Sequence, residues 1–347
     1  MFPKLKILLI FVPISIALSF FLDGSLLSFI SSALAIIPLA ALMSSLTDQL
    51  QKALGSSWGG LVNVTFGNAT ELIISIFAIN DGLLNVVKAN ITGSIIMNLL
   101  LVLGLSFFLG GLKYQRQVFD KLLAITNSAM LMLAVAGMLI PAIFYYGSPN
   151  IKTLILDRLS IGVGIVLFAT YLIGLYFTLV FHEKEKKQER EEKTEDSKLY
   201  KKIIYLLLTT LFIAVEANIL VSSITVIQEK FKISPVFIGV IILPIISNVA
   251  EALTAIKMAR ENKIDLSITI AVGSSIQTAL FLVPLLIFYS HFTRHSMNIL
   301  FNIFEISSIV LSVLAINIVY LQGKSNWFEG IQLIAVYLII AIAFYFA

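Results

Sequence analysis

The sequence predicts an all-α integral membrane protein with eleven transmembrane helices: one extra N-terminal helix, then two inverted-topology repeats of five. Three observations predict this fold: the composition, the spacing of apolar runs, and a pattern that recurs at one constant offset. Of the 347 residues, 59% are hydrophobic and only 13% are charged, and the mean hydropathy is +0.98. A soluble domain is about one quarter charged, and a single soluble core cannot cover this much apolar surface.

The apolar runs define the expected elements, because a membrane-spanning helix needs roughly 20 mostly apolar residues. Eleven runs qualify: 5–22, 26–46, 58–80, 84–110, 121–146, 157–181, 200–227, 235–258, 264–290, 296–320 and 327–347. The first run follows two lysines, as in a signal peptide, but it lacks a small-x-small cleavage site, so we interpret it as a retained helix. We therefore expect four parts: the extra helix 1–22, a first repeat 23–181, a charged linker 182–199 and a second repeat 200–347.

Basic residues predict the orientation of these spans. If the N-terminus is cytoplasmic, 18 of the 24 Lys and Arg residues face the cytoplasm and six face the outside. The charged linker is then cytoplasmic, and a solvated helix or loop is its simplest interpretation. We expect the plasma membrane of a prokaryote, with an organelle membrane left open. The partners expected are the lipid bilayer and transported ions. No nucleic-acid partner is expected, and a homo-oligomer stays open.

An internal repeat divides the chain. The separation between Glu71 and Glu251 is the same as that between GSIIMNLLLVLG, from Gly93, and GSSIQTALFLVP, from Gly273, and we call it the repeat offset. Each repeat has an odd number of spans, so the second must enter the membrane in the opposite direction. Inverted repeats are common in secondary transporters and predict a substrate site near the midplane, where the halves meet.

The charges expected inside the membrane are acidic. Glu71, Glu216, Glu251 and Glu305 fall within predicted spans, whereas every Lys and Arg is expected in a loop or at a span end. A lone charge at the bilayer centre costs roughly 2.5 kcal/mol or more. Acids without basic partners must take protons, bind cations, or alternate between the two. Two facing carboxylates cannot both stay charged after a metal leaves, so at least one then takes a proton.

The residues around two of these acids supply oxygen ligands. Asn68 and Glu71 share a helix face, and Asn248 and Glu251 repeat this arrangement. The predicted cation ligands are Glu71, Glu251, Asn68, Asn248, Asn98, Gln277, Ser94 and Ser274. Hard divalent cations such as Ca²⁺ prefer such oxygen shells, and the absence of thiol and imidazole on these faces argues against zinc or copper.

Three further acids have open roles. Glu216 and Glu305 are candidate members of the ion or proton pathway, with a structural role left open for Glu305. Asp48, near the cytoplasmic end of its span, can also simply reach water. The chain has no cysteine, so disulfides and thiolate metal sites are excluded. No cofactor is expected, because a cation bound by these oxygen atoms would be a substrate.

Two of these segments are similar to a known family. GGLVNVTFGNATELIISIFAI at 59–79 and FIGVIILPIISNVAEALTAI at 237–256 resemble the two signature helices of the calcium/cation–proton exchangers (the CAX family) of the calcium/cation antiporter superfamily. The resemblance covers nearly the whole chain. It implies eleven spans, a cytoplasmic linker, and Glu71 and Glu251 as central ligands. Ser247 and Ala252 stand where the family usually has glycine and histidine, which bears on selectivity and pH dependence.

These features predict a secondary active transporter that exchanges cytoplasmic Ca²⁺, or a related divalent cation, for protons by alternating access. Glu71 and Glu251 would carry cation and protons in turn. The alternatives are a sodium-coupled calcium exchanger on the same fold and a passive cation channel. Gln277, where an acid would add a sodium ligand, favours protons. An enzyme is not expected, because the sequence shows no nucleophile–base pair, phosphate loop or zinc cluster.

Overall fold

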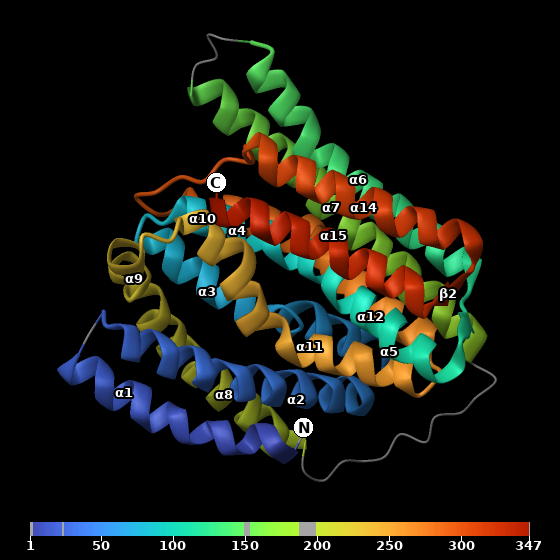
Figure 1. The fold of residues 1–347 in the computed structure, drawn as a ribbon, viewed down its shortest axis with the longest axis horizontal. Helices are drawn as coiled ribbons and strands as arrows, with labels where there is room; N and C mark the ends of the chain where they lie inside the picture. Colours follow the sequence, from blue (N-terminus) through green and yellow to red (C-terminus); the bar gives the residue numbers. More distant parts are fainter. Residues whose placement is uncertain (1–2, 23, 149–152, 187–198, 347) are drawn as a thin grey trace.

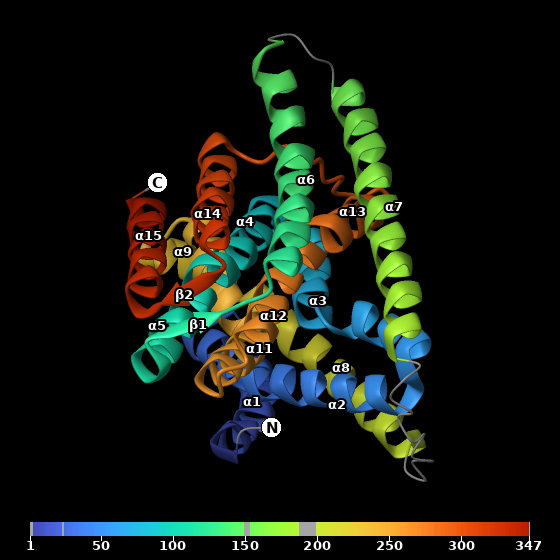
Figure 2. The same ribbon diagram turned by 90° about the vertical axis from the view of Figure 1, so that its right-hand side faces the viewer.

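The chain folds into a bundle of helices (Figures 1 and 2). The computed structural model describes residues 3–22, 24–148, 153–186 and 199–346. The first half contains η1 (Pro3–Ile10), α1 (Phe11–Phe21), α2 (Leu26–Phe66), α3 (Ala69–Asn80), α4 (Leu84–Ile96), η2 (Met97–Val102), α5 (Leu103–Tyr114), α6 (Lys121–Tyr146) and α7 (Thr153–Lys186). The second half contains α8 (Leu199–Ser222), α9 (Ile224–Phe231), α10 (Pro235–Phe237), η3 (Ile238–Ile242), α11 (Leu243–Arg260), α12 (Ile264–Gln277), η4 (Thr278–Leu282), α13 (Val283–Ser290), α14 (Ile303–Gln322) and α15 (Trp327–Phe346).

The predicted multi-pass membrane fold is confirmed. Within the described residues, nine helices are long and apolar enough to cross a membrane. A bent pair, Gly59–Phe66 and Ala69–Asn80, meets at 40° and makes a tenth span if it counts as one. The N-terminal helix Leu5–Phe21 is apolar but shorter. Each of these segments overlaps a predicted apolar run, although α14 begins seven residues after its run starts. The total of eleven spans stays a prediction, because it depends on the short helix and on counting the bent pair as one span.

Helix α2 contains the predicted span 26–46 and the beginning of the predicted span 58–80, joined across a break. Gly55 has φ 77° and ψ −175°, a conformation that favours glycine because a side chain would clash. The helix therefore changes direction at Gly55, and its last part, Gly59–Phe66, leads into α3. Most of the charged linker, residues 187–198, lies outside the described residues, so its predicted character is untested.

Two apolar clusters hold the helices together. Helices α1, α2 and α8 pack on one another, and their smaller cluster is built from side chains such as Leu39, Met43 and Ile213. The larger cluster runs through α4, α5, α11, α12 and α13 and joins both halves of the chain. In Figure 2, α6 and α7 extend beyond the rest of the bundle as two long neighbouring helices. The predicted cation ligands lie on α3, α4, η2, α11 and α12 and at Asn68, which directly precedes α3.

The repeat recurs in the local geometry. Two π-helical segments, η2 and η4, end at Val102 and Leu282, which the repeat offset relates to each other. A π-helical turn has a wider hydrogen-bond spacing than an α-helix, and such turns occur frequently at functional sites. Each segment directly follows, or contains, predicted site residues of its half. The same irregularity thus interrupts α4–α5 and α12–α13.

Two glycines related by the repeat have unlike surroundings. A Cβ atom added at Gly93 would lie 2.1 Å from the carbonyl oxygen of Val240 and 2.6 Å from Cγ of Pro244. Helix α4 therefore packs backbone to backbone against η3 and the start of α11, which only glycine permits. A Cβ atom at Gly273, on α12, would meet no atom within 4 Å. The interface beside Gly93 is therefore closed, with backbone in direct contact, and the equivalent space beside Gly273 is open.

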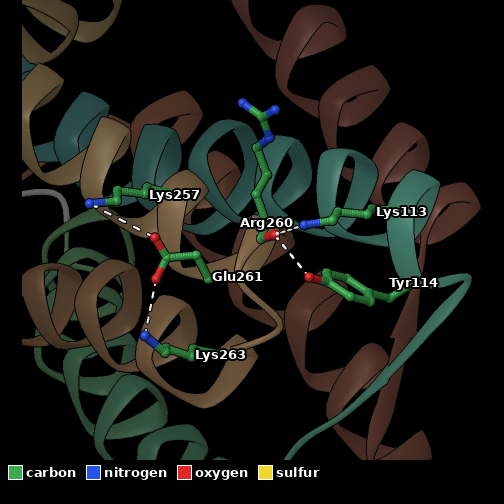
Figure 3. A network of polar contacts seen from close by, with 6 residues as sticks. All are labelled: Lys113, Tyr114, Lys257, Arg260, Glu261 and Lys263. Carbon is green, nitrogen blue, oxygen red and sulfur yellow. Dashed lines mark hydrogen bonds and ion pairs between the residues drawn. The ribbon is translucent and has the colours of Figure 1, made fainter.

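The ends of α5 and α11 are joined by polar contacts (Figure 3). The carbonyl oxygen of Arg260, the last residue of α11, accepts hydrogen bonds from Lys113 Nζ at 3.1 Å and Tyr114 Oη at 3.3 Å. Gln117 Nε2 donates to the Ala259 carbonyl oxygen at 2.8 Å. Gln117 lies on β1 (Arg116–Val118), which pairs antiparallel with β2 (Lys324–Asn326). These contacts satisfy carbonyl groups that the helix end leaves without intrahelical partners.

The carboxylate of Glu261, next to this helix end, leads to a prediction about stability at different pH values. A hydrogen bond from Lys263 at 3.0 Å, with Lys257 at 3.8 Å, holds the pKa of the Glu261 carboxyl below its ordinary value of 4.5. A lowered pKa stabilises the folded state above the unfolded pKa, and this contribution is lost as the pH falls through the folded pKa. Because the carboxylate is exposed, we expect Glu261→Gln to change the melting temperature very little at neutral pH. Thermal unfolding between about pH 3 and pH 7 should show the small difference from the wild type disappear at the acid end; a large loss at pH 7 would contradict this.

Candidate functional site

Glu71 lies in the first turn of α3, directly after a break in the helix. Asn68 has φ −109° and ψ 25°, so α2 ends and α3 begins here instead of forming one continuous helix. The free N–H groups and positive dipole end of a helix N-terminus favour a negative charge nearby. Thr65 lies before the break, is exposed, and donates to the Leu61 carbonyl oxygen, so it does not share the polar face of Glu71.

The carboxylate of Glu71 is buried and held by neutral donors. Only 2% of the residue is exposed. Its Oε1 accepts hydrogen bonds from Asn248 Nδ2, at 2.6 Å, and from Ser94 Oγ, and its Oε2 accepts one from Thr278 Oγ1 at 3.3 Å. These donors come from α11, α4 and η4, so helices of both repeats orient this one carboxylate. No Lys, Arg or His hydrogen-bonds to it among the described residues.

Glu251 lies in the middle of α11 and lines the same small cavity as Glu71, of about 10 Å³. This volume is close to the smallest that holds one water molecule. Oε2 of Glu251 is buried and accepts no hydrogen bond within the described part of the chain. A buried carboxylate oxygen without a donor is costly, so this oxygen is open to a proton or a cation.

The remaining predicted ligands form a second polar group beside the two acids. Asn68 Nδ2 donates to Gln277 Oε1 at 3.1 Å, and Asn98 Nδ2 donates to Ser274 Oγ at 3.1 Å. Ser274 Oγ in turn donates to Asn68 Oδ1 at 3.4 Å. The predicted cation ligands thus lie in two neighbouring groups. One contains the two glutamates with Ser94 and Asn248, and the other is the hydrogen-bonded set of Asn68, Asn98, Ser274 and Gln277.

Thr278 belongs to this site and was missed by the sequence reasoning. The repeat offset relates it to Asn98, a residue that was predicted. The i, i+4 spacing from Gly273 led instead to Gln277, one residue earlier. Since η4 is π-helical and begins at Thr278, both adjacent side chains reach the site, with Gln277 bonded to Asn68 and Thr278 to Glu71. Strict use of the repeat offset would have found it.

A larger cavity of about 350 Å³ adjoins the site on one side. Glu251, Gly67 and Ser44 line both this cavity and the small one, so the two are adjacent. Its lining is mostly polar and includes Ser274 and Gln277. The small cavity that both carboxylates line therefore adjoins a larger polar space.

The donor set fits a hard cation held by oxygen atoms. Within the described ranges, no group of three or more His, Cys, Asp or Glu side chains could hold a metal ion. Among the predicted ligands, the two glutamates are the charged side chains, and the other oxygens belong to amides and hydroxyls. Calcium accepts six to eight such oxygens, with water filling the remainder.

Glu216 lies away from these ligands. It is fully buried in α8, and the hydroxyl of Ser15 on α1 donates to its carboxylate, with Oγ 2.7 Å from Oε1 and 2.6 Å from Oε2. It lines neither of the two polar cavities described above. The contact joins the N-terminal helix to the second repeat, and a role in the ion pathway stays a hypothesis.

Glu305 is placed differently from the sequence expectation of an acid within a span. Helix α14 starts at Ile303, seven residues later than the predicted run, so Glu305 lies in its first turn. There it forms a capping box, in which the Asn302 N–H donates to Glu305 Oε2 at 2.9 Å and the Glu305 N–H donates to Asn302 Oδ1 at 2.8 Å. Lys88 lies close enough to interact with its charge, so the expectation that these acids lack a basic neighbour is wrong for Glu305.

A pair of variants tests this structural role. We expect Glu305→Gln to keep both stability and transport, because glutamine also completes a capping box. Glu305→Ala should lower stability by about 1 kcal/mol while the transport rate per folded molecule stays unchanged. Thermal unfolding and cation flux in vesicles, measured on both variants, check this. Loss of flux in a stable Glu305→Gln protein would instead place Glu305 in the pathway.

The fold and the site together define a multi-pass membrane transporter of cations. The chain belongs to the sodium/calcium exchanger protein family, whose family model matches residues 24–180 and 201–346. It is 41% identical to a Ca²⁺/H⁺ antiporter of Synechocystis over 358 residues, covering 98% of this chain and 96% of that protein. It is 42% identical to the Ca²⁺/H⁺ antiporter ChaA of Bacillus subtilis over 341 residues, covering 96% of each.

Solved structures agree with these relatives. The structure of native YfkE matches with a TM-score of 0.86 and 38% identity, covering 99% of this chain and 100% of that one. The sodium–calcium exchanger NCX_Mj matches with a TM-score of 0.56 and 20% identity, covering 96% of each chain, and shows a common fold alone. The resemblance to the calcium/cation–proton exchangers is confirmed, and the sodium-coupled alternative has only a distant relative.

Proposed function

We propose that this protein exchanges cytoplasmic Ca²⁺, or a related divalent cation, for protons by alternating access. The observation that carries this proposal is the pair of buried glutamates, Glu71 and Glu251, lining one small cavity between the repeats. The surrounding donors are all neutral, so nothing in the site offsets the two negative charges except a cation or protons. The relatives named Ca²⁺/H⁺ antiporters support the same conclusion.

The two carboxylates have different roles in this mechanism. Glu71 is held by donors from Ser94, Asn248 and Thr278, which keep its oxygens aimed at the cavity. Glu251 keeps one oxygen without a donor, and this oxygen receives the cation or the proton. Cation binding requires both groups to be ionised, and release of the cation leaves two buried negative charges that take up protons. The same oxygens therefore cannot hold cation and protons together, which couples the two fluxes.

The larger cavity opens toward the cytoplasm in our orientation. It is lined by residues of α2, α11 and α12, toward the helix ends at Gly55, Arg260 and Ile264, and the predicted orientation puts these ends on the cytoplasmic side. The excess of Lys and Arg on that side supports a cytoplasmic assignment, with a cytoplasmic N-terminus. We also propose the division into an extra helix, 1–22, and two five-helix repeats, 23–181 and 200–347, separated by the linker 182–199.

The test is a flux measurement in sealed vesicles that contain the purified protein. A pH gradient is imposed without sodium, and calcium uptake and internal pH are followed together. We expect the two ions to move in a coupled way, and we expect a protonophore to abolish calcium uptake. Calcium movement that requires sodium would favour the sodium-coupled exchanger, and calcium movement without any coupled ion would mean a channel. Vesicles with Glu71→Gln protein serve as the inactive control.

A further inference from the structure

The polar cavity of about 350 Å³ contains an acid that the exchange site does not use. Its lining residues are Ser44, Thr47, Asp48, Gln51, Asn63, Gly67, Glu251, Thr254, Thr269, Ile270, Gly273, Ser274 and Gln277. Asp48 and Glu251 are the two carboxylates in this lining, and they come from α2 and α11. Asp48 is exposed, whereas Glu251 faces the inner end, where it also lines the small cavity. An ion that approaches Glu251 through this cavity therefore passes Asp48.

A second polar group next to Asp48 lacks a partner. Thr47 is 1% exposed, lines the same cavity, and its Oγ1 has no hydrogen-bond partner in the described chain. A buried hydroxyl normally finds a partner, because an unpaired one has lost its hydrogen bonds to water. A water molecule or hydrated ion in the cavity would supply this partner. The cavity is large enough for several waters, each of which takes up about 30 Å³.

The polarity of this cavity is not a requirement of the fold. The repeat offset relates Asn63, Thr254, Thr269 and Gln277 to positions in the other half that are buried and apolar. Those counterparts are Leu243, Ile74, Ala89 and Met97. The segments MSSLTDQLQK at 43–52 and VSSITVIQEK at 221–230 also match, at a slightly shorter offset, and put Val226 in the place of Asp48. At these positions the lining of the cavity is polar and carries Asp48, whereas the repeat-related positions are apolar.

We propose that Asp48, together with the hydroxyl of Thr47, forms an entry station for a partly hydrated divalent cation, on the path to Glu251 and Glu71. The attraction of a carboxylate for a divalent ion is twice that for a monovalent ion at the same distance. A cavity with low-dielectric walls concentrates this field and raises the local cation concentration. The station collects cations from the side where the proposed exchanger must bind them, so this inference rests on the proposed function.

The experiment measures the concentration dependence of calcium flux for Asp48→Asn, which removes the charge and keeps the shape. We expect the half-saturating Ca²⁺ concentration on the cavity side to rise about tenfold at low ionic strength, with the maximal rate unchanged. The difference should shrink at high salt, because screening acts over about 10 Å at 0.1 M. Asp81→Asn is the matched control, since Asp81 is an exposed acid at the opposite end of α3. It should leave the cavity-side half-saturation unchanged.

Further variants exclude a purely structural effect. Asp48→Glu keeps the charge and should therefore have the half-saturating Ca²⁺ concentration of the wild type. Thr47→Val should raise this concentration, but less than Asp48→Asn does. An unchanged half-saturation in a folded Asp48→Asn protein, or a loss of maximal rate alone, would overturn the entry station. The exchange mechanism itself would still stand in that case, because wild-type coupling is measured in the same vesicles. If the wild type shows no proton-coupled calcium flux, it is the proposed function that fails.

Discussion

Glu71→Gln and Glu251→Gln should each lower proton-coupled calcium flux by about 100-fold or more while the protein still folds. A divalent cation in a site of low dielectric depends on the full charge of both carboxylates, because the surrounding amides and hydroxyls are neutral. Glutamine has nearly the same shape, so packing around α3 and α11 is preserved. At Glu71 the new amide also places N–H donors against those of Ser94, Asn248 or Thr278, which weakens their contacts.

Two measurements separate loss of the site from loss of the fold. Calcium should raise the melting temperature of the wild type, because a ligand that binds only the folded state stabilises it, and this shift should vanish in both variants. Glu305→Gln is the matched control, since it also neutralises a buried acid but lies in the capping box of α14. It should keep both the flux and the calcium-dependent shift. Normal calcium flux in either Glu71→Gln or Glu251→Gln would show that the site is assigned wrongly.

Alanine at the two repeat-related glycines should have different effects. Gly93→Ala should lower the stability of the protein, whereas Gly273→Ala should keep the stability and lower the transport rate. Gly93→Ala places a methyl group 2.1 Å from the backbone oxygen of Val240, so α4 must move away from η3. Overpacking of this kind costs about 1–3 kcal/mol, and we expect a clear fall in the melting temperature. Gly273→Ala meets no atom within 4 Å and should leave the melting temperature equal or slightly higher, because alanine favours helix.

Transport should nevertheless fail in Gly273→Ala. In an inverted repeat, alternating access exchanges the conformations of the two halves, so the opposite-facing state places Gly273 where Gly93 lies now. The added methyl group would then clash with the backbone around Gly60, the residue that the repeat relates to Val240. A cost of about 2 kcal/mol in that state alone depopulates it roughly 30-fold. We expect the flux to fall by at least about tenfold. Full flux in a stable Gly273→Ala protein would contradict an exchange of conformations between the halves.

The sequence alone determined the membrane fold and the chemical character of the site. Apolar runs place the spans because hydropathy is a property of each segment, independent of its neighbours. The repeat offset links Glu71 to Glu251 and Asn68 to Asn248, and a duplicated sequence folds into duplicated geometry. The expected oxygen ligands are therefore found together, and the family that their motifs resemble is confirmed by the comparisons.

Tertiary structure decided the features that depend on contacts between distant segments. Thr278 donates a hydrogen bond to Glu71, which lies far from it in the sequence. Glu305 caps α14, and the helix begins seven residues later than hydropathy predicted. Gly93 and Gly273 occupy equivalent positions in sequence, yet one is closed against Val240 and the other is open. The physical reason is that identical segments have unlike neighbours when the two halves adopt different positions. Sequence periodicity describes each helix, whereas the access path depends on how the helices meet.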